Sequence, residues 1–133
     1  IREDAKIKAG KGAKDTDILR AHYSFADVDD EAGLAGIVEL SHLCEPDIVV
    51  VTGTVPHERR HAYWGLSEAC TDLELWRSTQ SNIATLFATD SSVINPSRIM
   101  RVAGTVSYPN TDKQRRGYIS ELVTMKEKVN GCH

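Results

Sequence analysis

The sequence has 133 residues, of which 41% are hydrophobic and 26% charged, a composition that predicts one globular domain with a core of its own. It holds no apolar run of roughly 18 residues and no basic-then-apolar leader, which argues against a membrane-spanning or secreted protein. The formal net charge of -3 lacks the basic balance that is usual in nucleic-acid-binding domains.

The first half of the chain predicts a polar N-terminal segment, a strand, a helix and a β-hairpin. The first strand alternates and carries aromatic residues, the helix has apolar residues at helical spacing, and the hairpin strands are apolar runs on either side of Gly53. Asp29 or Asp30 is available as the N-cap of the helix. These elements are a flexible segment over 1–20, a strand over 21–28, a helix over 30–44, and strands over 47–53 and 61–66.

The second half predicts a helix and two further strands. Thr71 followed by Glu74 has the spacing of a capping box at the start of the helix. The strands are expected over 98–107 and 117–126, with turn residues over 108–116 between them. One face of the helix is expected to hold Leu73, Trp76, Ile83, Leu86 and Phe87. The order β-α-β-β-α-β-β predicts an α+β domain over 21–128, with a sheet covered by helices on one face.

Charge and cysteine are distributed unevenly along the chain. Acid is concentrated from Asp27 to Glu31, whereas the stretch from Arg98 to Lys128 is basic. The cysteines at 44, 70 and 132 are odd in number and far apart, which is typical of reduced thiols in a cytoplasmic protein. Because the sequence starts at Ile1 rather than Met, we expect a piece of a longer protein.

Three aspartates are candidates for a metal centre. Asp27 and Asp29 stand two apart at the end of the first predicted strand, so their side chains share one face. Carboxylates at that range repel each other, and a hard divalent cation such as Mg²⁺ or Mn²⁺ would relieve the repulsion. The alternative is a solvated acidic turn in which Asp30 caps the helix. Asp90 follows the second predicted helix and, taken alone, is typical of a loop aspartate.

The H-E-R-R-H run from His57 to His61 matches the H-E-x-x-H signature of zinc proteases. That mechanism needs both histidines on one face of a helix. Pro56 precedes the first histidine and a strand-like segment follows the second, so we expect a hairpin loop instead. The sequence therefore disfavours a zinc hydrolase.

Two arginines, Arg98 and Arg101, flank two apolar residues in the predicted strand over 98–107. Arginine beside a metal cluster suits a triphosphate or a backbone phosphate, whereas a paired surface arginine is the plain alternative. Gly104 in the same strand would allow the close approach of a backbone or a ligand.

From about Tyr23 to Val123 these segments resemble the archaeo-eukaryotic primase superfamily, in its RepB-like and phage or plasmid primase-polymerase branch. The matching motifs are D-x-D at Asp27 and Asp29, a strand ending in Thr52 and Gly53, H-x-Y-W from His61 to Trp64, an aspartate at Asp90, and P-x-R-I-M-R-x-x-G-T from Pro96 to Thr105. The last block is the most specific of these motifs and D-x-D is the least.

The resemblance implies an RRM-like sheet, mixed or antiparallel, with flanking helices. It also implies that Asp27, Asp29 and Asp90 are catalytic carboxylates that bind Mg²⁺ or Mn²⁺ and meet at one edge of the sheet. The implied nucleotide site consists of His61, as a catalytic residue that contacts the incoming triphosphate, and of Thr52, Gly53, Arg98 and Arg101. The link from Thr52 to His61 is longer than in many relatives and holds a second candidate, His57.

These roles imply a DNA primase or DNA-directed polymerase, a nucleotidyltransferase that joins nucleotides on a template. Two metal ions would activate the attacking 3′-oxygen and stabilise the departing pyrophosphate. The expected partners are nucleoside triphosphates, a single-stranded DNA template with its primer, and a helicase domain or replication protein, with no membrane partner. The alternative is a replication-initiation or nucleic-acid-binding module that has the same fold and no turnover.

Overall fold

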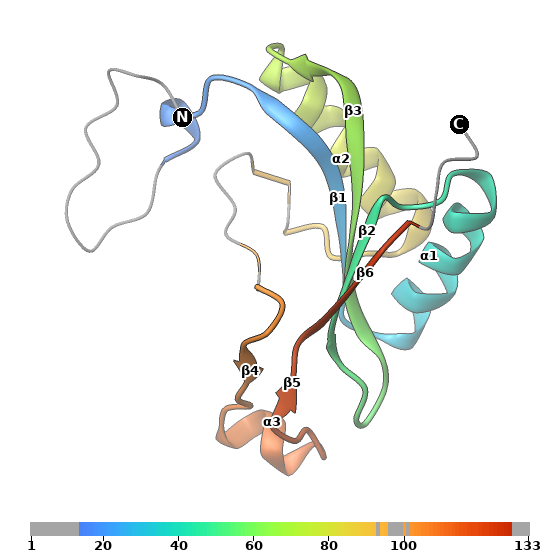
Figure 1. Cartoon of the computed structure of the whole chain (residues 1–133), viewed down its shortest axis with the longest axis vertical. Coiled ribbons are helices and arrows are strands. Elements are labelled where there is room, and N and C mark those ends of the chain that lie inside the picture. The colour runs from blue at the N-terminus through green and yellow to red at the C-terminus, as the bar shows by residue number, and fades with distance from the viewer. Residues whose placement is uncertain (1–13, 93, 96–99, 101, 129–133) are drawn as a thin grey trace.

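The computed structural model describes residues 14–92, 94–95, 100 and 102–128 of the chain (Figure 1). Its elements, in chain order, are η1 (Asp15–Asp17), β1 (Ala21–Val28), α1 (Glu31–Leu43), β2 (Ile48–Gly53), β3 (Arg59–Cys70), α2 (Leu73–Phe87), β4 (Val106–Ser107), α3 (Thr111–Arg115), β5 (Glu121–Leu122) and β6 (Thr124–Glu127). The ranges of β1, α1 and β2 agree with the predictions. Most of the predicted N-terminal segment lies outside the described residues.

A sheet with the strand order β1-β3-β2-β6 forms the centre of the described structure. Every neighbouring pair in it is antiparallel, so the predicted α+β class is confirmed and the sheet is antiparallel rather than mixed. β3 lies between β1 and β2, and His61 of β3 stands opposite Asp27 on one side and Val50 on the other. β4 and β5 pair with each other in a separate small sheet.

Alternation along β1 divides its side chains between the two faces of the sheet. Ala26 and Val28 are buried and pack with Ile37 of α1 in the hydrophobic core. Both long helices, α1 and α2, lie together over this face (Figure 1). Asp27 alternates with the two core residues and therefore belongs to the opposite face. No helix in the described part of the chain combines the length and the apolar character that crossing a membrane requires.

Helix α2 also satisfies the polar backbone along the outer edge of β1, which is an edge strand of its sheet. The indole nitrogen of Trp76 donates to the carbonyl oxygen of Tyr23 at 2.9 Å. The amide of Gln80 donates to the carbonyl oxygen of Phe25 at 2.8 Å and accepts from its backbone N–H at 3.1 Å. The hydroxyl of Ser24 donates to the same amide oxygen. These contacts satisfy groups that an uncovered edge strand would leave unpaired.

Two details of α2 differ from the prediction. Its N-cap is Asp72, whose side chain accepts from the backbone N–H of Leu75 at 3.1 Å, and not Thr71. The buried stripe consists of Trp76, Gln80 and Ala84, which are spaced four apart. Leu86, placed on the core face by its apolar character, is 75% exposed. The prediction was right for Trp76, which is buried, and for Ile83, which packs against the core. It missed Gln80, which is polar and is hydrogen-bonded to β1.

The described part of the last third of the chain contains less strand than predicted. Of the range 98–107, residues 98, 99 and 101 lie outside the described residues, and among the others only Val106–Ser107 form a strand. Gly104 has a φ of +85°, which turns the chain just before β4. Nothing lies within 4 Å of the position that a Cβ would take there, so the glycine serves backbone conformation rather than close approach.

The predicted strand over 117–126 is divided into β5 and β6, which pair with different strands. β5 pairs with β4, whereas β6 pairs with β2. Val123 lies between them, is buried, and exchanges backbone hydrogen bonds with the turn before β4, at Gly104 and Thr105. The predicted turn residues over 108–116 include the short helix α3, which Asn110 caps by accepting from the backbone N–H of Lys113 at 2.8 Å.

Candidate functional site

The structure brings the three candidate aspartates together. Asp27 is near the end of β1, Asp29 lies just beyond that end, and Asp90 lies in the loop after α2. One carboxylate oxygen from each residue lies within 4.8 Å of the other two. Among the described residues, this acidic cluster is the one group of three or more His, Cys, Asp or Glu side chains with the spacing of a metal site. The closeness of the three side chains agrees with the expectation that they meet at one edge of the sheet.

The end of α2 places Asp90 beside β1. The helix ends at Phe87, its C-cap Ala88 has a φ of +56°, and the backbone N–H of Thr89 donates to the carbonyl oxygen of Ala84 at 3.1 Å. The backbone N–H of Asp90 then donates to the carbonyl oxygen of Asp27 at 2.9 Å. The carboxylate of Asp90 accepts from the backbone N–H of Ser92 at 2.9 Å and from its hydroxyl at 2.7 Å.

A glycine in α1 allows this end of α2 to lie close to its neighbour. A Cβ at Gly36 would lie 1.9 Å from the carbonyl oxygen of Phe87, which excludes any side chain at this position without movement of the backbone. Gly33, one turn earlier, is less restricted, with 3.0 Å between a Cβ and the carbonyl oxygen of Ala88. The close contact of α1 with α2 therefore fixes the point from which the Asp90 loop departs.

The acidic cluster is electrostatically crowded. Desolvation, the charges of Asp27 and Asp90, and a hydrogen bond with Asp27 raise the pKa of Asp29 to about 6, and the charge of Lys113 opposes them. Oδ1 of Asp27 is buried and has no hydrogen-bond partner among the described residues. A hard divalent cation would compensate these charges and satisfy the oxygen of Asp27, so the residues present fit Mg²⁺ or Mn²⁺.

We expect Asp29→Asn to raise the free energy of unfolding of the metal-free protein above pH 6 by about 1 kcal/mol, a value that allows for solvent screening. The pKa of Asp29 in the folded state, about 6, exceeds the ordinary 3.8. The wild type therefore loses stability relative to the variant as the pH rises from about 4 to about 6. Below about pH 4 the carboxyl is protonated in both states and the difference should vanish. Urea denaturation of both proteins in EDTA from pH 4 to 8 measures it, and a pH-independent difference would contradict the assignment.

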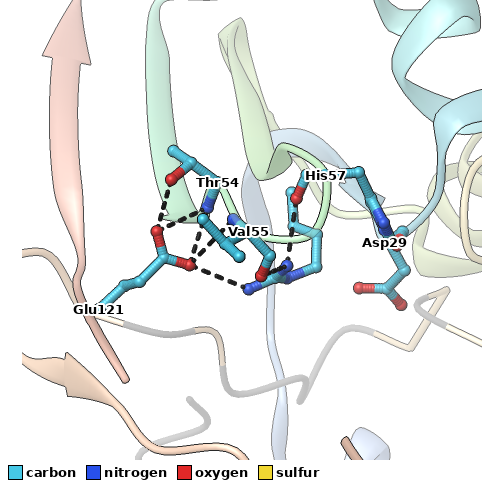
Figure 2. Close-up of polar contacts among 6 residues, drawn as sticks. Asp29, Thr54, Val55, His57 and Glu121 are labelled. Carbon is cyan, nitrogen blue, oxygen red and sulfur yellow. Dashed lines mark hydrogen bonds and ion pairs between the residues drawn. The ribbon is translucent and has the colours of Figure 1, made fainter. Parts of the chain in front are cut away.

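Both candidate histidines lie beside the aspartates. Nε2 of His61 is 3.4 Å from Oδ1 of Asp27, and Nδ1 of His61 is buried with no hydrogen-bond partner among the described residues. His57 lies in the loop between β2 and β3, where its Nε2 is 2.6 Å from the backbone carbonyl oxygen of Asp29 (Figure 2). The H-E-x-x-H run therefore spans a loop and the start of β3, and the helix that a zinc protease needs is not formed by these residues.

Of the other predicted nucleotide-binding residues, the structure describes Thr52 and Gly53 but not the two arginines. Thr52 is buried near the end of β2. A Cβ at Gly53 would lie 1.9 Å from Nη2 of Arg59 and 2.8 Å from Oε2 of Glu121, so this glycine makes room for a buried arginine and its partner. Arg98 and Arg101 lie outside the described residues.

Glu121, which no sequence motif indicated, holds the β2–β3 loop in place (Figure 2). Its carboxylate accepts from the backbone N–H of Thr54 at 2.9 Å, from the Thr54 hydroxyl at 2.5 Å and from the backbone N–H of Val55 at 3.2 Å. It also pairs with Arg59 at 3.4 Å. Desolvation works to raise the pKa of Glu121, but these hydrogen bonds and the Arg59 charge lower it, so Glu121 remains ionised. The contact fixes the loop that carries His57.

An apolar pocket lies on the face of the sheet that carries Asp27. It has a volume of about 520 Å³, and its lining includes Tyr23, Val50, Tyr63 and Met125. The rings of Tyr23 and Tyr63 meet edge-on, with 6.5 Å between their centres. Burial and the charge of Asp27 raise the pKa of Tyr63. Val50 of the pocket lining stands beside His61, which in turn stands opposite Asp27 in the sheet. The pocket and the carboxylates are therefore parts of one surface.

Comparison with known proteins supports a single family. No protein-family model and no curated protein matches the sequence. Among solved structures, the chain is similar to the archaeo-eukaryotic primase domain of the primase-polymerase from cyanophage S-2L, with a TM-score of 0.62 and 28% sequence identity. The similarity covers 86% of this chain and 56% of that one, so the chain spans little more than half the length of its structural relative. This fold match, with the D-x-D, H-x-Y-W and aspartate motifs in the expected order, supports membership of the archaeo-eukaryotic primase superfamily.

Proposed function

We propose that this chain carries the nucleotidyltransferase centre of a DNA primase-polymerase, which joins nucleotides on a nucleic-acid template in a metal-dependent reaction. The observation that carries the proposal is the acidic cluster, in which oxygens of Asp27, Asp29 and Asp90 lie within 4.8 Å of one another. The similarity to a cyanophage primase-polymerase domain supports it. The basic final third of the chain is consistent with a nucleic-acid partner.

Asp27, Asp29 and Asp90 would hold Mg²⁺ or Mn²⁺, in the two-metal arrangement that the resemblance implies. Bound divalent ions would supply Lewis-acid stabilisation of the negative charge that develops during phosphoryl transfer. The protein contributes position: the backbone bond from Asp90 to Asp27 fixes the loop carboxylate against the strand. Such preorganisation means that the carboxylates need not rearrange during the reaction.

His61 is the better candidate for the contact to the incoming triphosphate. It stands opposite Asp27 in the sheet, and its buried Nδ1 has no hydrogen-bond partner among the described residues. His57, in contrast, uses its Nε2 on the backbone of Asp29, which indicates a structural role in holding the loop. Thr52, Arg98 and Arg101 complete the proposed nucleotide site, in which the arginines would contact phosphates.

The apolar pocket beside the acidic cluster is where we place the nucleobase or sugar. Aromatic side chains on an open sheet face are a common platform for bases, because stacking tolerates different bases. Tyr23 and Tyr63 provide such rings at the pocket. The proposed partners are therefore nucleoside triphosphates and a single-stranded DNA template with its primer, with a helicase domain or replication protein as a further partner.

Extension of a labelled primer on a single-stranded DNA template tests this function. With Mn²⁺ or Mg²⁺ and deoxynucleotides, we expect the wild-type chain to extend the primer and EDTA to stop the reaction. The second candidate is a nucleic-acid-binding or replication-initiation module without turnover, because the match covers 56% of the cyanophage domain. Binding of nucleotide and metal without extension would favour this module, and the absence of both binding and extension would overturn both candidates.

A further inference from the structure

Tyr118, which follows α3, is surrounded by positively charged side chains. The guanidinium carbons of Arg59 and Arg116 lie 4.3 and 5.2 Å from the centre of its ring, and Nζ of Lys113 lies 5.7 Å away. These distances are within the range of cation–π interactions. The ring of His57 meets Tyr118 edge-on, with 5.9 Å between the ring centres. Cations this close together repel one another, so the Tyr118 ring and nearby anions must offset this electrostatic repulsion.

Arg59 is the member of this group that the protein itself uses. It is buried, and its guanidinium donates to the carbonyl oxygens of Val55 and His57 at 2.9 and 3.1 Å. It also pairs with Glu121 at 3.4 Å. Arg59 therefore uses its hydrogen bonds to hold the β2–β3 loop, and its guanidinium packs against the ring of Tyr118.

Lys113 and Arg116 remain directed toward solvent, and with Tyr118 they form what we call the basic cluster. Both are exposed, and the ion pair of Arg116 with Asp112, at 3.3 Å, joins side chains that are 56% and 76% exposed. Such an exposed pair contributes little and is easily exchanged for another anion. Within the described ranges, Lys113 takes part in no ion pair. Two cationic groups held over one ring are thus available to a ligand.

The basic cluster adjoins the acidic cluster through His57. The His57 ring meets Tyr118 edge-on, and Nε2 of the same histidine is 2.6 Å from the backbone carbonyl oxygen of Asp29. Among the ion pairs of the described residues, none joins Lys113 or Arg116 to Asp27 or Asp29. Opposite charges in this arrangement suit a ligand that bridges them. Phosphate groups meet this need, because their oxygens can bind both metal ions and cationic side chains.

We infer that Lys113 and Arg116, supported by the ring of Tyr118, form a phosphate-binding site next to the metal centre. This inference rests on the proposed function and adds to it the residues that hold phosphate outside the family motifs. The ligand is a phosphate group, which is supplied either by the triphosphate tail of the incoming nucleotide or by the backbone of the DNA strand. Arg59 acts as a positioning residue, because it reaches the ligand only through Tyr118.

Binding measurements on matched variants test the site. We expect Lys113→Gln and Arg116→Gln each to weaken phosphate binding about tenfold, the usual effect of losing one charge-assisted hydrogen bond. Arg115→Gln removes the same charge from the same short helix, but Arg115 is not at the Tyr118 ring, so it serves as the control and should change affinity less than twofold. Tyr118→Phe keeps the ring and should bind as wild type, whereas Tyr118→Leu should resemble Lys113→Gln.

Two ligands distinguish the source of the phosphate. Weaker binding of inorganic tripolyphosphate and deoxynucleoside triphosphate, with unchanged binding of a labelled single-stranded oligonucleotide, identifies the nucleotide tail, and the reverse identifies the DNA strand. Unchanged affinity for both ligands, or an equal loss in Arg115→Gln, overturns the inference. Because oligonucleotide and tripolyphosphate binding can be measured in EDTA, failure of primer extension alone would remove the proposed function and leave this site standing.

Discussion

Asp90→Asn is expected to reduce primer extension by about 10²-fold or more, the usual cost of removing one group from a preorganised electrostatic site. The change removes a charge from a cluster whose three carboxylate oxygens lie within 4.8 Å of one another. Loss of that charge weakens metal binding and relieves repulsion in the metal-free protein. The variant should therefore lose extension while its thermal unfolding midpoint in EDTA stays equal to or above that of the wild type. Rates at saturating Mn²⁺, with thermal unfolding of the same samples, measure both effects.

Asp30→Asn is the matched control for this experiment. Asp30 is next to Asp29 but caps α1 through the backbone N–H of Gly33 at 2.8 Å and is not part of the acidic cluster. Asparagine caps helices about as well as aspartate, so this variant should keep both its fold and its extension rate. Wild-type extension by Asp90→Asn would refute the metal-centre assignment, and a large fall in its stability would point to a structural role for Asp90.

Local sequence patterns predicted the elements whose stability depends on near neighbours. β1, α1 and β2 follow from alternation, helical spacing and an apolar run, and the hairpin was expected from Pro56 and Gly53. The prediction failed where a strand is short and its partner is distant. β5 and β6 look like one continuous strand in the sequence, yet they pair with β4 and β2 respectively. Only the tertiary fold determines that division.

The candidate site was predictable to the extent that its residues belong to motifs. Asp27 and Asp29 are visible as D-x-D, and the resemblance to primases linked them to Asp90. Glu121 and Tyr118 belong to no local sequence motif. Their roles depend on contacts with the β2–β3 loop, which is about sixty positions away in the sequence; one example is the hydrogen bond between Glu121 and Thr54. Residues of this kind are found only when the loop and the strand are seen together.

β1 shows why fold and site cannot be separated in this protein. Its even-numbered residues Ala26 and Val28 face the helices and are buried, whereas Asp27 stands on the opposite face. Its outer edge is covered by Trp76 and Gln80 of α2, and the same helix ends in the loop that returns Asp90 to Asp27. One strand thus joins the core, the edge contact and the acidic cluster.

We therefore expect Trp76→Ala to cost about 3–5 kcal/mol of unfolding free energy, the usual range for the loss of a large buried aromatic side chain. Trp76 is 4% exposed and its ring meets that of Phe25 edge-on, with 5.5 Å between their centres. The substitution also leaves the carbonyl oxygen of Tyr23 without its indole donor. Urea denaturation followed by circular dichroism measures the loss.

Two neighbouring substitutions separate burial from the edge contact. Leu75→Ala changes a side chain that is 60% exposed on the same helix and should alter stability by no more than about 0.5 kcal/mol. Trp76→Phe keeps most of the packing but removes the donor to Tyr23, and should cost about 1–3 kcal/mol. Equal stability of Trp76→Phe and wild type would mean that the bond to the edge of β1 contributes nothing. Equal losses in Trp76→Phe and Trp76→Ala would mean that the hydrogen bond, rather than packing, holds α2 and its aspartate loop against the strand.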